Sequence, residues 1–513
     1  MIVLANSKQK RVRVTDKITE KNIATWNPEQ PVIITAGTGV GKSYFIKNIL
    51  YKYAKADNQR ILMLIHRKLC VEQFRMEIKE DGKSDVIEIM TYQKLEKNEM
   101  YEIDLKLQQY KYIVCDEFHY FISDASFNNT TDISFKKITG MNDAIKIFMS
   151  ATGENVEEYI KKIVKTNPIN YMIPFDWSFI ETLNFYYNDA SLSEFAKAVI
   201  ENGKKGIFFI QQATKAYKFY QEFQQYAIFN CSKQNEKYYK YVNEDKINQM
   251  LKEQTFEENI LITTSCMDAG VNIIDELVRF IFIDIKDVGS LIQCMGRKRI
   301  QSSEDTIHVF IKVVNNQQLG GLETNAKRQL EMADYLKDHT TEEWLKQYPR
   351  QIDKTQTVYD EIINDGNTET CTKKVNDLMY HKKKLDIEEI HSMKELGDFG
   401  YCKYLARKFN KYDPDTGFYD YVTISGNYGL ENYLATHVGQ VMLQRKDRKE
   451  LINTIDVRRD GHLKKSRDIL NAALKEDNLP YRIEEFETSK MINGKKKKFK
   501  SAWRIVTHNW SVN

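Results

Sequence analysis

Short apolar runs alternate with longer segments of mixed polarity through roughly the first 315 residues. The runs that read as buried strands are Val32–Thr35, Ile61–Ile65, Val86–Met90, Tyr112–Cys115 and Ile145–Met149, followed after about Pro174 by Gly206–Ile210, Ile260–Thr263 and Phe280–Ile283. Segments of helical character, such as Leu69–Glu77, lie between them. Near-continuous apolar strands separated by helices are typical of parallel sheets covered on both faces. The pattern therefore predicts an α/β fold with two domains in series.

A glycine-rich loop follows the first predicted strand. Its sequence is Ala36-Gly37-Thr38-Gly39-Val40-Gly41-Lys42-Ser43, and the apolar segment Tyr44–Leu50 after it reads as the opening of a helix. Strand, glycine loop and helix in this order form a phosphate-binding loop, because the backbone can curl its N–H groups around a phosphate at a helix N-terminus. Lys42 is expected to reach the β- and γ-phosphates, and the Ser43 hydroxyl to bind Mg²⁺. The loop predicts a nucleotide triphosphatase that uses ATP and Mg²⁺.

Two adjacent carboxylates end the predicted strand Tyr112–Cys115. Asp116 and Glu117 are followed by Phe118 and His119. Acidic residues at the carboxyl end of a strand beside a phosphate loop suit metal-dependent hydrolysis, because one carboxylate orients Mg²⁺ and the other polarises the attacking water. We therefore predict Asp116 as a metal and catalytic residue and Glu117 as a catalytic residue.

The order of these and further motifs resembles superfamily 2 helicases of the DExH-box type, which have tandem RecA-like domains. Asp116-Glu117-Phe118-His119 is similar to the DExH box, and Ser150-Ala151-Thr152 to the motif that links hydrolysis to domain movement. Gln293-Cys294-Met295-Gly296-Arg297-Lys298-Arg299 is similar to the sixth motif, which supplies arginine fingers. The resemblance implies catalytic roles for Gln293, Arg297 and Arg299 and coupling roles for His119, Ser150 and Thr152.

The same resemblance implies contacts with nucleic acid. Arg67, with Leu69 and Gln73, is similar to the motif that lies along the nucleic-acid backbone, and Thr91-Tyr92-Gln93 to the next one. Thr263-Thr264-Ser265, with Asp268 and Gly270, is similar to the fifth motif. The residues implied to bind nucleic acid are Arg67, Thr91, Gln93 and Thr264, and Gly270 is implied to lie at the nucleotide. Within the superfamily, the chain resembles replicative or mobile-element helicases of low-GC bacteria and their phages.

The sequence departs from the family pattern in three ways. The last arginine of the sixth motif usually stands one residue after Arg299, and Ala36 replaces the leading glycine of the phosphate loop. No adenine-reading glutamine motif precedes the loop, so Trp26 or Gln30 is the expected neighbour of the base.

The chain beyond about Asn325 changes to charged, helical segments. We predict an N-terminal segment over residues 1–25, RecA-like domains over 26–175 and 176–320, a helical accessory region over 321–428 and a basic domain over 429–513. A helical segment, Leu463–Leu474, precedes two extended runs joined by Asn493-Gly494, which favours a hairpin and a winged-helix-like domain. From Glu431 onward 18 lysines and arginines face 11 acidic residues, a net charge of +7, whereas the whole chain carries +4. Such a basic end favours a polyanionic partner.

Composition excludes several classes of protein. No apolar run approaches the roughly 18 residues of a membrane span, and the N-terminus lacks the features of a signal peptide. The seven cysteines are scattered without a CxxC pair, which argues against a zinc site or a disulfide framework. We expect a cytoplasmic protein without a membrane partner.

The function predicted from the sequence is an ATP-dependent helicase or translocase on nucleic acid, with DNA in single-stranded or forked form favoured over RNA. Two alternatives stay open. One is an RNA helicase, since both kinds of enzyme hold phosphates. The other is a nucleic-acid-stimulated ATPase that acts as a switch or loader without unwinding. A fused nuclease is disfavoured, because no metal-binding nuclease motif is present.

Overall fold

A computed structural model describes residues 12–37, 39–66, 68–123, 130–152, 154–267, 271–349, 357–364, 369–424, 428–459, 462–477, 479–492, 495–508 and 510. Two compact units divide the chain. The first comprises Met1–Glu181, Lys205–Ile307 and Glu323–Glu389, and the second comprises Thr182–Lys204, His308–Leu322 and Ile390–Asn513. In the part of the chain that the structure describes, no helix is long and apolar enough to cross a membrane.

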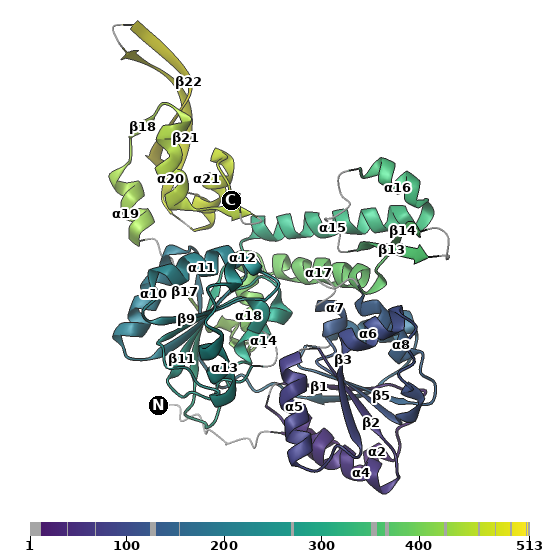
Figure 1. The fold of residues 1–513 in the computed structure, drawn as a ribbon. Helices are drawn as coiled ribbons and strands as arrows, with labels where there is room; N and C mark the ends of the chain where they lie inside the picture. Colours follow the sequence, from purple (N-terminus) through teal and green to yellow (C-terminus); the bar gives the residue numbers. More distant parts are fainter. Residues whose placement is uncertain are drawn as a thin grey trace. The chain divides into compact units, whose positions relative to one another are not determined.

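The first unit begins with a six-stranded parallel sheet, drawn in purple and blue in Figure 1. Its strands are β1 (Val32–Ala36), β2 (Ile61–Ile65), β3 (Ile87–Thr91), β4 (Tyr112–Asp116), β5 (Ile145–Ser150) and β6 (Ile169–Ile173). They lie in the order β3-β2-β4-β5-β1-β6. Each pair of neighbouring strands in this order is parallel, as the sequence predicts.

Helices cover both faces of this sheet (Figure 1). They are α1 (Val14–Lys17), α2 (Glu20–Ile23), α3 (Lys42–Tyr44), α4 (Tyr51–Ala56), α5 (Lys68–Glu80), α6 (Tyr92–Met100), α7 (Tyr120–Ser123), α8 (Thr131–Thr139) and α9 (Glu154–Tyr159). Alternate strand residues enter two separate cores: Ile34 packs with α4 and α5, whereas Ile33 packs with α6 and α8. Because both faces are buried, the strands need apolar residues at every position.

Four parallel strands of a second sheet also belong to the first unit. They are β8 (Lys205–Ile210), β9 (Ala227–Asn230), β10 (Ile260–Thr263) and β11 (Val278–Asp284), in the order β11-β8-β10-β9. The pairings of β10 with β8 and β9, and of β11 with β8, are parallel. The helices with them are α11 (Ala213–Glu222), α12 (Glu236–Tyr239), α13 (Glu244–Glu253) and α14 (Val288–Met295). This repeat of parallel strands and helices matches the predicted pair of α/β, RecA-like domains.

The rest of the first unit is helical apart from one hairpin. It contains most of α15 (Asn316–Asp338) and α17 (Asp377–Glu395), all of α16 (Thr341–Gln347), and the antiparallel strands β13 (Val358–Asn364) and β14 (Glu369–Val375). Trp344 is fully buried in a small core with Met332 and Val358, and its indole N–H donates to the Met332 carbonyl at 2.9 Å. The predicted accessory region is therefore ordered by a core of its own.

The second unit holds strands in the order β17-β7-β12 and a separate C-terminal group. The strands are β17 (Val422–Ile424), β7 (Ile180–Tyr186) and β12 (Ile307–Lys312), with α10 (Ala190–Glu201), α18 (Gly400–Lys408) and the short pair β15 (Tyr412–Asp413) and β16 (Phe418–Tyr419). The C-terminal group contains α19 (Tyr428–Thr436), β18 (Val441–Met442), α20 (Lys449–Ile455), β19 (Arg458–Arg459), β20 (His462–Leu463), α21 (Arg467–Glu476), β21 (Tyr481–Ile492) and β22 (Lys495–Thr507). Strands β21 and β22 pair antiparallel, which confirms the predicted hairpin.

Candidate active site

Three strands of the first sheet bring the candidate residues to one edge. Strand β5 lies between β1 and β4, and Thr35 and Asp116 pair with Ser150 and Met149 of β5. The phosphate loop follows β1, the carboxylate pair follows β4, and the Ser150–Thr152 segment follows β5. Because the strands are parallel, all three segments leave the sheet at its carboxyl edge, where ligands of open α/β sheets bind.

The phosphate loop depends on glycine at two positions. Gly39 and Gly41 have φ angles of +76° and +92°, in a region that side chains with a Cβ rarely adopt. Gly41 stands immediately before α3, and Lys42 and Ser43 form the first turn of that helix. Thr38 lies outside the described residues. The loop therefore leads into a helix N-terminus as the sequence predicts.

Lys42 is held inside the loop. Its ammonium donates to the carbonyl of Ala36 at 2.9 Å and lies 4.0 Å from Oε1 of Glu117. Lys42 is buried, whereas Ser43 is exposed. A buried cation at the mouth of a phosphate loop can neutralise phosphate oxygens.

Asp116 and Glu117 occupy different electrostatic environments. Burial and the neighbouring charge of Glu117 raise the pKa of Asp116 to about 7. Burial also opposes ionisation of Glu117, but the charges of Lys42 and His119 outweigh it and hold the pKa of Glu117 well below its ordinary value. Glu117 is thus a carboxylate in this site, which suits a residue that polarises water.

The turn that carries Glu117 is strained and anchored. Glu117 has a φ of +48°, a left-handed conformation that costs a non-glycine residue about 1–2 kcal/mol. The hydroxyl of Tyr92 donates to the Asp116 carbonyl at 2.9 Å, and the Tyr92 ring stacks on Tyr120 with centroids 4.6 Å apart. Backbone strain of this kind persists where surrounding contacts hold it, and it is frequent at functional sites.

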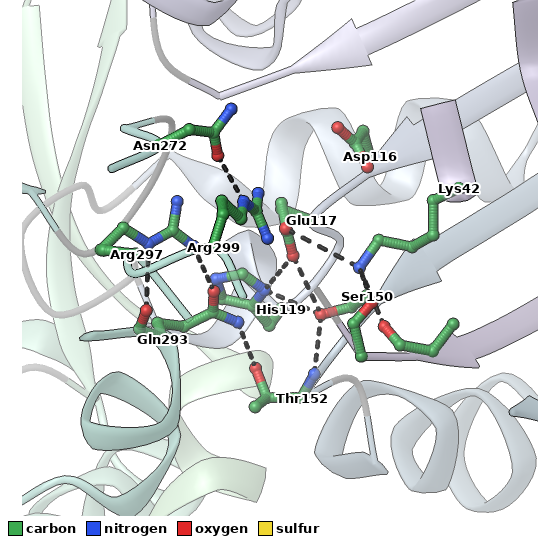
Figure 2. A network of polar contacts seen from close by, with 12 residues as sticks. Lys42, Asp116, Glu117, His119, Ser150, Thr152, Asn272, Gln293, Arg297 and Arg299 are labelled. Carbon is green, nitrogen blue, oxygen red and sulfur yellow. Dashed lines mark hydrogen bonds and ion pairs between the residues drawn. The ribbon is translucent and has the colours of Figure 1, made fainter. Parts of the chain in front are cut away.

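A chain of polar contacts links Glu117 to Gln293 on α14, which in turn bonds Arg297. Figure 2 shows Nδ1 of His119 between Oε2 of Glu117, 3.4 Å away, and Oγ of Ser150, 2.9 Å away. The same Ser150 oxygen accepts from the Thr152 backbone N–H at 3.0 Å. The Gln293 amide then donates to the Thr152 hydroxyl at 3.1 Å. His119 thus contacts the Ser150–Thr152 segment, and the coupling roles of these residues remain predictions.

Two arginines follow Gln293, and they lie in different surroundings. Arg297 is 3% exposed and donates through Nη2 to Oε1 of Gln293 at 3.0 Å. Arg299 donates to Oδ1 of Asn272 at 2.6 Å and lines a cavity of about 470 Å³ that Gly37 and Gly39 also line. In this arrangement Arg299 borders the same space as the phosphate loop, although it stands one residue before the usual motif position.

The loop between these arginines is fixed by an ion pair. Nζ of Lys298 lies 2.6 Å from Oδ2 of Asp305, and both side chains are almost completely buried. The same carboxylate oxygen accepts from the backbone N–H of Gln301 at 2.9 Å. A buried pair with an additional hydrogen bond holds a loop in one geometry, so Lys298 positions Arg297 and Arg299.

The residues implied to bind nucleic acid are only partly described. Arg67 and Gly270 lie outside the described residues. Thr91 caps α6 by accepting from the Lys94 N–H at 3.0 Å, and Gln93 on the same helix is exposed. Thr264 is buried. Contacts of these residues with nucleic acid remain predictions.

The side chains expected beside the base have structural contacts instead. Trp26 is buried in the core of the first sheet, where its indole N–H donates to the Tyr171 hydroxyl at 3.2 Å. The Gln30 amide donates to the Asn167 carbonyl at 3.4 Å. Trp26 is therefore a core residue, because its ring fills space beside Phe45 rather than an opening at the loop.

One positioning contact was not predicted from the sequence. Asp287 caps α14 by accepting from the Ser290 N–H at 2.8 Å, and α14 carries Gln293. Nζ of Lys382, on α17, lies 3.2 Å from Asp287 and 2.8 Å from Asp386. Burial disfavours the charge on Lys382, yet the two carboxylates raise the pKa of Lys382.

Helix α17 also packs on the first sheet. Leu378 is 1% exposed within the core that Ile33 enters, and the His381 ring lies 5.4 Å from that of Tyr159. One helix thus contacts both the first sheet and the helix that carries Gln293. The signal that could have revealed it, a lysine four residues before an aspartate, is common on solvated helices.

Part of the chain matches a known protein family. Residues 5–86 and 76–155 match the family described as "Type III restriction enzyme, res subunit", which belongs to the superfamily 2 helicases. The matched stretch contains the phosphate loop, the Asp116–His119 motif and the Ser150–Thr152 segment. It supports a helicase-like, ATP-dependent enzyme of nucleic acid that uses ATP and a divalent metal. No curated protein matches the chain.

Several solved structures share a distant likeness. S. cerevisiae Dbp5 bound to RNA and ADP BeF3 is 16% identical, with 60% of this chain and 84% of that chain covered and a TM-score of 0.44. Mss116p bound to ssRNA and AMP-PNP is 12% identical, with 64% and 78% covered and a TM-score of 0.43. The DUF1998 helicase MrfA bound to DNA and AMPPNP is 14% identical, with 57% and 47% covered and a TM-score of 0.41.

The donor set at the carboxyl edge fits the implied metal. Ser43 offers a hydroxyl oxygen and Asp116 a carboxylate, which are the hard oxygen ligands that Mg²⁺ prefers beside phosphate oxygens. A cation would also relieve the burial and repulsion that raise the pKa of Asp116.

Proposed function

We propose that this protein is an ATP-dependent translocase of the DExH type that moves along a DNA strand and unwinds it. The observation that carries the proposal is the polar chain from Glu117 through His119, Ser150 and Thr152 to Gln293. It connects the residue that would polarise water with the motif that would supply arginine fingers. A simple ATP hydrolase does not require contacts between these two motifs. A motor requires them, because it must link hydrolysis to domain movement.

In the proposed mechanism the first sheet binds the phosphates and the attacking water. Loop N–H groups and Lys42 neutralise the phosphate oxygens, and Glu117 accepts a hydrogen bond from the water. Ser43 and Asp116 would hold Mg²⁺, which supplies additional positive charge at the phosphates. Gly37, Val40 and Gly41 complete the loop that cradles the nucleotide, with Thr38 and Gly270 as further predicted neighbours.

The second half of the site comes from α14 and the loop after it. Arg297 or Arg299 stabilises the charge that develops on the γ-phosphate, a contribution of about 10³–10⁵ in rate. Gln293 responds to the nucleotide through Thr152, so closure of the two halves and hydrolysis depend on each other. Repeated closing and opening would move the strand, which Arg67, Thr91, Gln93 and Thr264 are proposed to hold by its phosphates.

The C-terminal hairpin supports a polyanionic partner. From Thr488 to Lys500 the chain carries six lysines and no acidic residue. Lys490 stands directly opposite Lys497 across the two strands, and both are exposed. Like charges in directly opposed positions destabilise a hairpin. Phosphates bound along the strands would remove this repulsion, and a winged-helix-like arrangement of α21 and the hairpin favours DNA.

Two other functions remain distinguishable from this proposal. An RNA helicase would hold phosphates through the same kind of contacts, and a nucleic-acid-stimulated switch would hydrolyse ATP without moving. The predicted resemblance to replication or mobile-element helicases of low-GC bacteria and phages, and a cytoplasmic location, stay predictions.

The test is steady-state ATP hydrolysis alone, with single-stranded DNA, with duplex DNA and with RNA, each at two salt concentrations. Stimulation by single-stranded DNA that weakens with salt, together with displacement of a labelled strand from a forked duplex, is the expected result. Stimulation by RNA alone would identify the RNA alternative. Stimulation by DNA without strand displacement would identify the switch.

A further inference from the structure

A cluster of tyrosines lies at the surface of the helices beside the second sheet. Tyr217 belongs to α11, Tyr238 belongs to α12, and Tyr241 follows α12. The rings of Tyr217 and Tyr241 are stacked with centroids 4.3 Å apart, and the Tyr238 ring lies 5.5 Å from that of Tyr217. Tyr241 is 42% exposed, and the other two are half-buried. The tyrosine cluster, which is Tyr217, Tyr238 and Tyr241, therefore presents aromatic surface to solvent.

The tyrosine cluster extends outward from the core of the second sheet. The ring of Phe229, a buried residue of β9, lies 5.9 Å from that of Tyr217. Exposure rises along this row of rings, from 2% at Phe229 to 42% at Tyr241. Phe229 and Tyr217 thus support Tyr241, whose own ring contributes little to the core. A tyrosine ring held at the surface in this way is typical of a residue that contacts a partner.

Lysines border the tyrosine cluster. The segment Lys233–Tyr241 contains three lysines and one acidic residue, Glu236. Nζ of Lys237 lies 5.3 Å from the centroid of the Tyr238 ring, and Nζ of Lys240 lies 5.0 Å from that of the Tyr241 ring. The third lysine, Lys233, pairs with Glu244 at 3.6 Å. Aromatic faces beside lysines suit a polyanion whose units carry flat rings, and single-stranded nucleic acid is such a polyanion.

The tyrosine cluster lies at the carboxyl edge of the second sheet. Helix α11 begins after β8 and α12 after β9, and the two helices are neighbours, as Figure 1 shows. The Tyr238 hydroxyl joins them by donating at 2.9 Å to the hydroxyl of Thr214, in the first turn of α11. Strand β10 lies between β8 and β9, is parallel to both, and ends at Thr263. Thr264, which is proposed to hold a phosphate, therefore leaves the sheet beside the strands that lead to the cluster.

We propose that the tyrosine cluster is a platform on which bases of single-stranded nucleic acid stack, with Tyr241 as the outermost ring and Lys237 and Lys240 at the phosphates. The inference rests on the proposed function and adds a contact with bases to a strand that is otherwise held by its phosphates. Stacking is open to every base, because each has a flat face, so the platform does not select a sequence. The bases of a duplex already stack on one another, which makes a single strand the ligand.

The test compares single-stranded DNA with an oligonucleotide that has phosphates but no bases. In the full chain, Tyr241→Leu removes the aromatic face and keeps an apolar side chain, and Tyr241→Phe keeps the face. Tyr226→Leu is the matched control, since Tyr226 is 40% exposed and stands before β9, at the opposite edge of the same sheet. Fluorescence anisotropy measures the affinity for oligothymidylate and for an abasic oligonucleotide of equal length.

Loss of one stacked base corresponds to about a 5- to 100-fold weaker affinity. Tyr241→Leu should weaken oligothymidylate binding by that factor and leave binding of the abasic oligonucleotide unchanged. Tyr241→Phe and the control should bind both as the wild type does. Equal affinity of Tyr241→Leu and wild type for oligothymidylate would overturn the platform, as would parallel losses for the two oligonucleotides or equal losses in both leucine variants. A wild type that binds neither oligonucleotide would instead refute the proposed function.

Discussion

Lys42 is a buried cation whose nearest partners are two backbone carbonyls and, at 4.0 Å, one carboxylate. Carbonyl dipoles stabilise an ammonium less than phosphate oxygens do. Binding of a phosphate would therefore stabilise the charge of Lys42 further. Glu117 beside it remains ionised because Lys42 and His119 outweigh the effect of burial. The site therefore places a buried positive charge, Lys42, 4.0 Å from a negative charge, Glu117.

We predict that Lys42→Ala lowers the rate of ATP hydrolysis by about 100-fold or more, since it removes a charge from the developing transition state. The fold should persist, because the polar contacts of Lys42 among the described residues are with its own loop and Glu117. Phosphate release and circular dichroism measure the two effects. Turnover that survives in a folded variant would contradict the assignment of the loop.

Arg297 and Arg299 are alternative candidates for the arginine finger. We predict that Arg297→Ala still binds ATP but loses about 10³-fold or more in kcat. Binding of a fluorescent nucleotide and single-turnover hydrolysis separate the two effects. Arg299→Ala is the informative comparison, since Arg299 lines the cavity beside the phosphate loop. If only Arg299→Ala lost turnover, the finger would be Arg299 and Arg297 would serve to hold Gln293.

Helix α14 is the element on which the second half of the site depends. Asp287 caps its first turn, Gln293 lies near its end, and Lys382 of α17 holds the cap. The same α17 buries Leu378 in the core of the first sheet. Helix α17 is therefore anchored both in the core of the first sheet and at the N-terminus of α14. We expect a displacement of the first sheet to be passed to α14 through these two contacts.

We predict that Lys382→Met lowers kcat for ATP by roughly 10- to 100-fold, because small displacements of catalytic groups have effects of this size. KM should change little, since the phosphate loop is untouched. Lys382→Arg should restore part of the rate by renewing the ion pair. Steady-state kinetics with saturating nucleic acid provide the measurement.

Lys384→Met is the control, because Lys384 is an exposed residue of the same helix that lies over the Tyr380 ring. It should leave kcat at the wild-type value. Equal losses in both variants would show that α17 acts only through general stability.

At the scale of the whole molecule, positive charge is concentrated in one structural part. The excess of lysine and arginine falls after Glu431, and six of these lysines occupy the end of the β21–β22 hairpin. The proximal part of the hairpin contributes Tyr481, Ile483 and Trp503 to the C-terminal core. The distal part extends beyond α20 and α21, as Figure 1 shows. A two-stranded ribbon with lysines on both faces can lie in the groove of a duplex.

We predict that changing Lys496, Lys497 and Lys498 to serine weakens duplex binding and lowers the salt dependence. Each lost phosphate contact reduces the slope of log K against log salt by about 0.9. The slope should therefore fall by up to about 3, while ATP hydrolysis without nucleic acid stays unchanged. Fluorescence anisotropy over a range of salt concentrations provides the measurement.

The triple Lys→Arg variant is the matched control, since it keeps every charge. Its slope should equal that of the wild type. An unchanged slope in the serine variant would mean that the hairpin does not contact phosphates.

Elements with a local sequence pattern could be predicted before the fold was known. The buried strands β1, β2, β4 and β5 are apolar at successive positions, because both faces of a parallel sheet are covered. The phosphate loop and the carboxylate pair are also contiguous segments, so their chemistry is visible without a fold. Strand β6 was not predicted, because it lies at the edge of its sheet and its residues alternate between half-buried and exposed.

Contacts between residues far apart in the chain became visible only in the folded protein. Gln293 and Thr152 are 141 positions apart in the chain and bond directly. Lys382 and Asp287 are likewise joined only by folding. The energy of such contacts depends on how the helices and strands pack rather than on which residues are adjacent in the chain. Composition and motif spacing therefore do not predict them. For that reason the motifs were readable in advance, while the contacts that connect them were not.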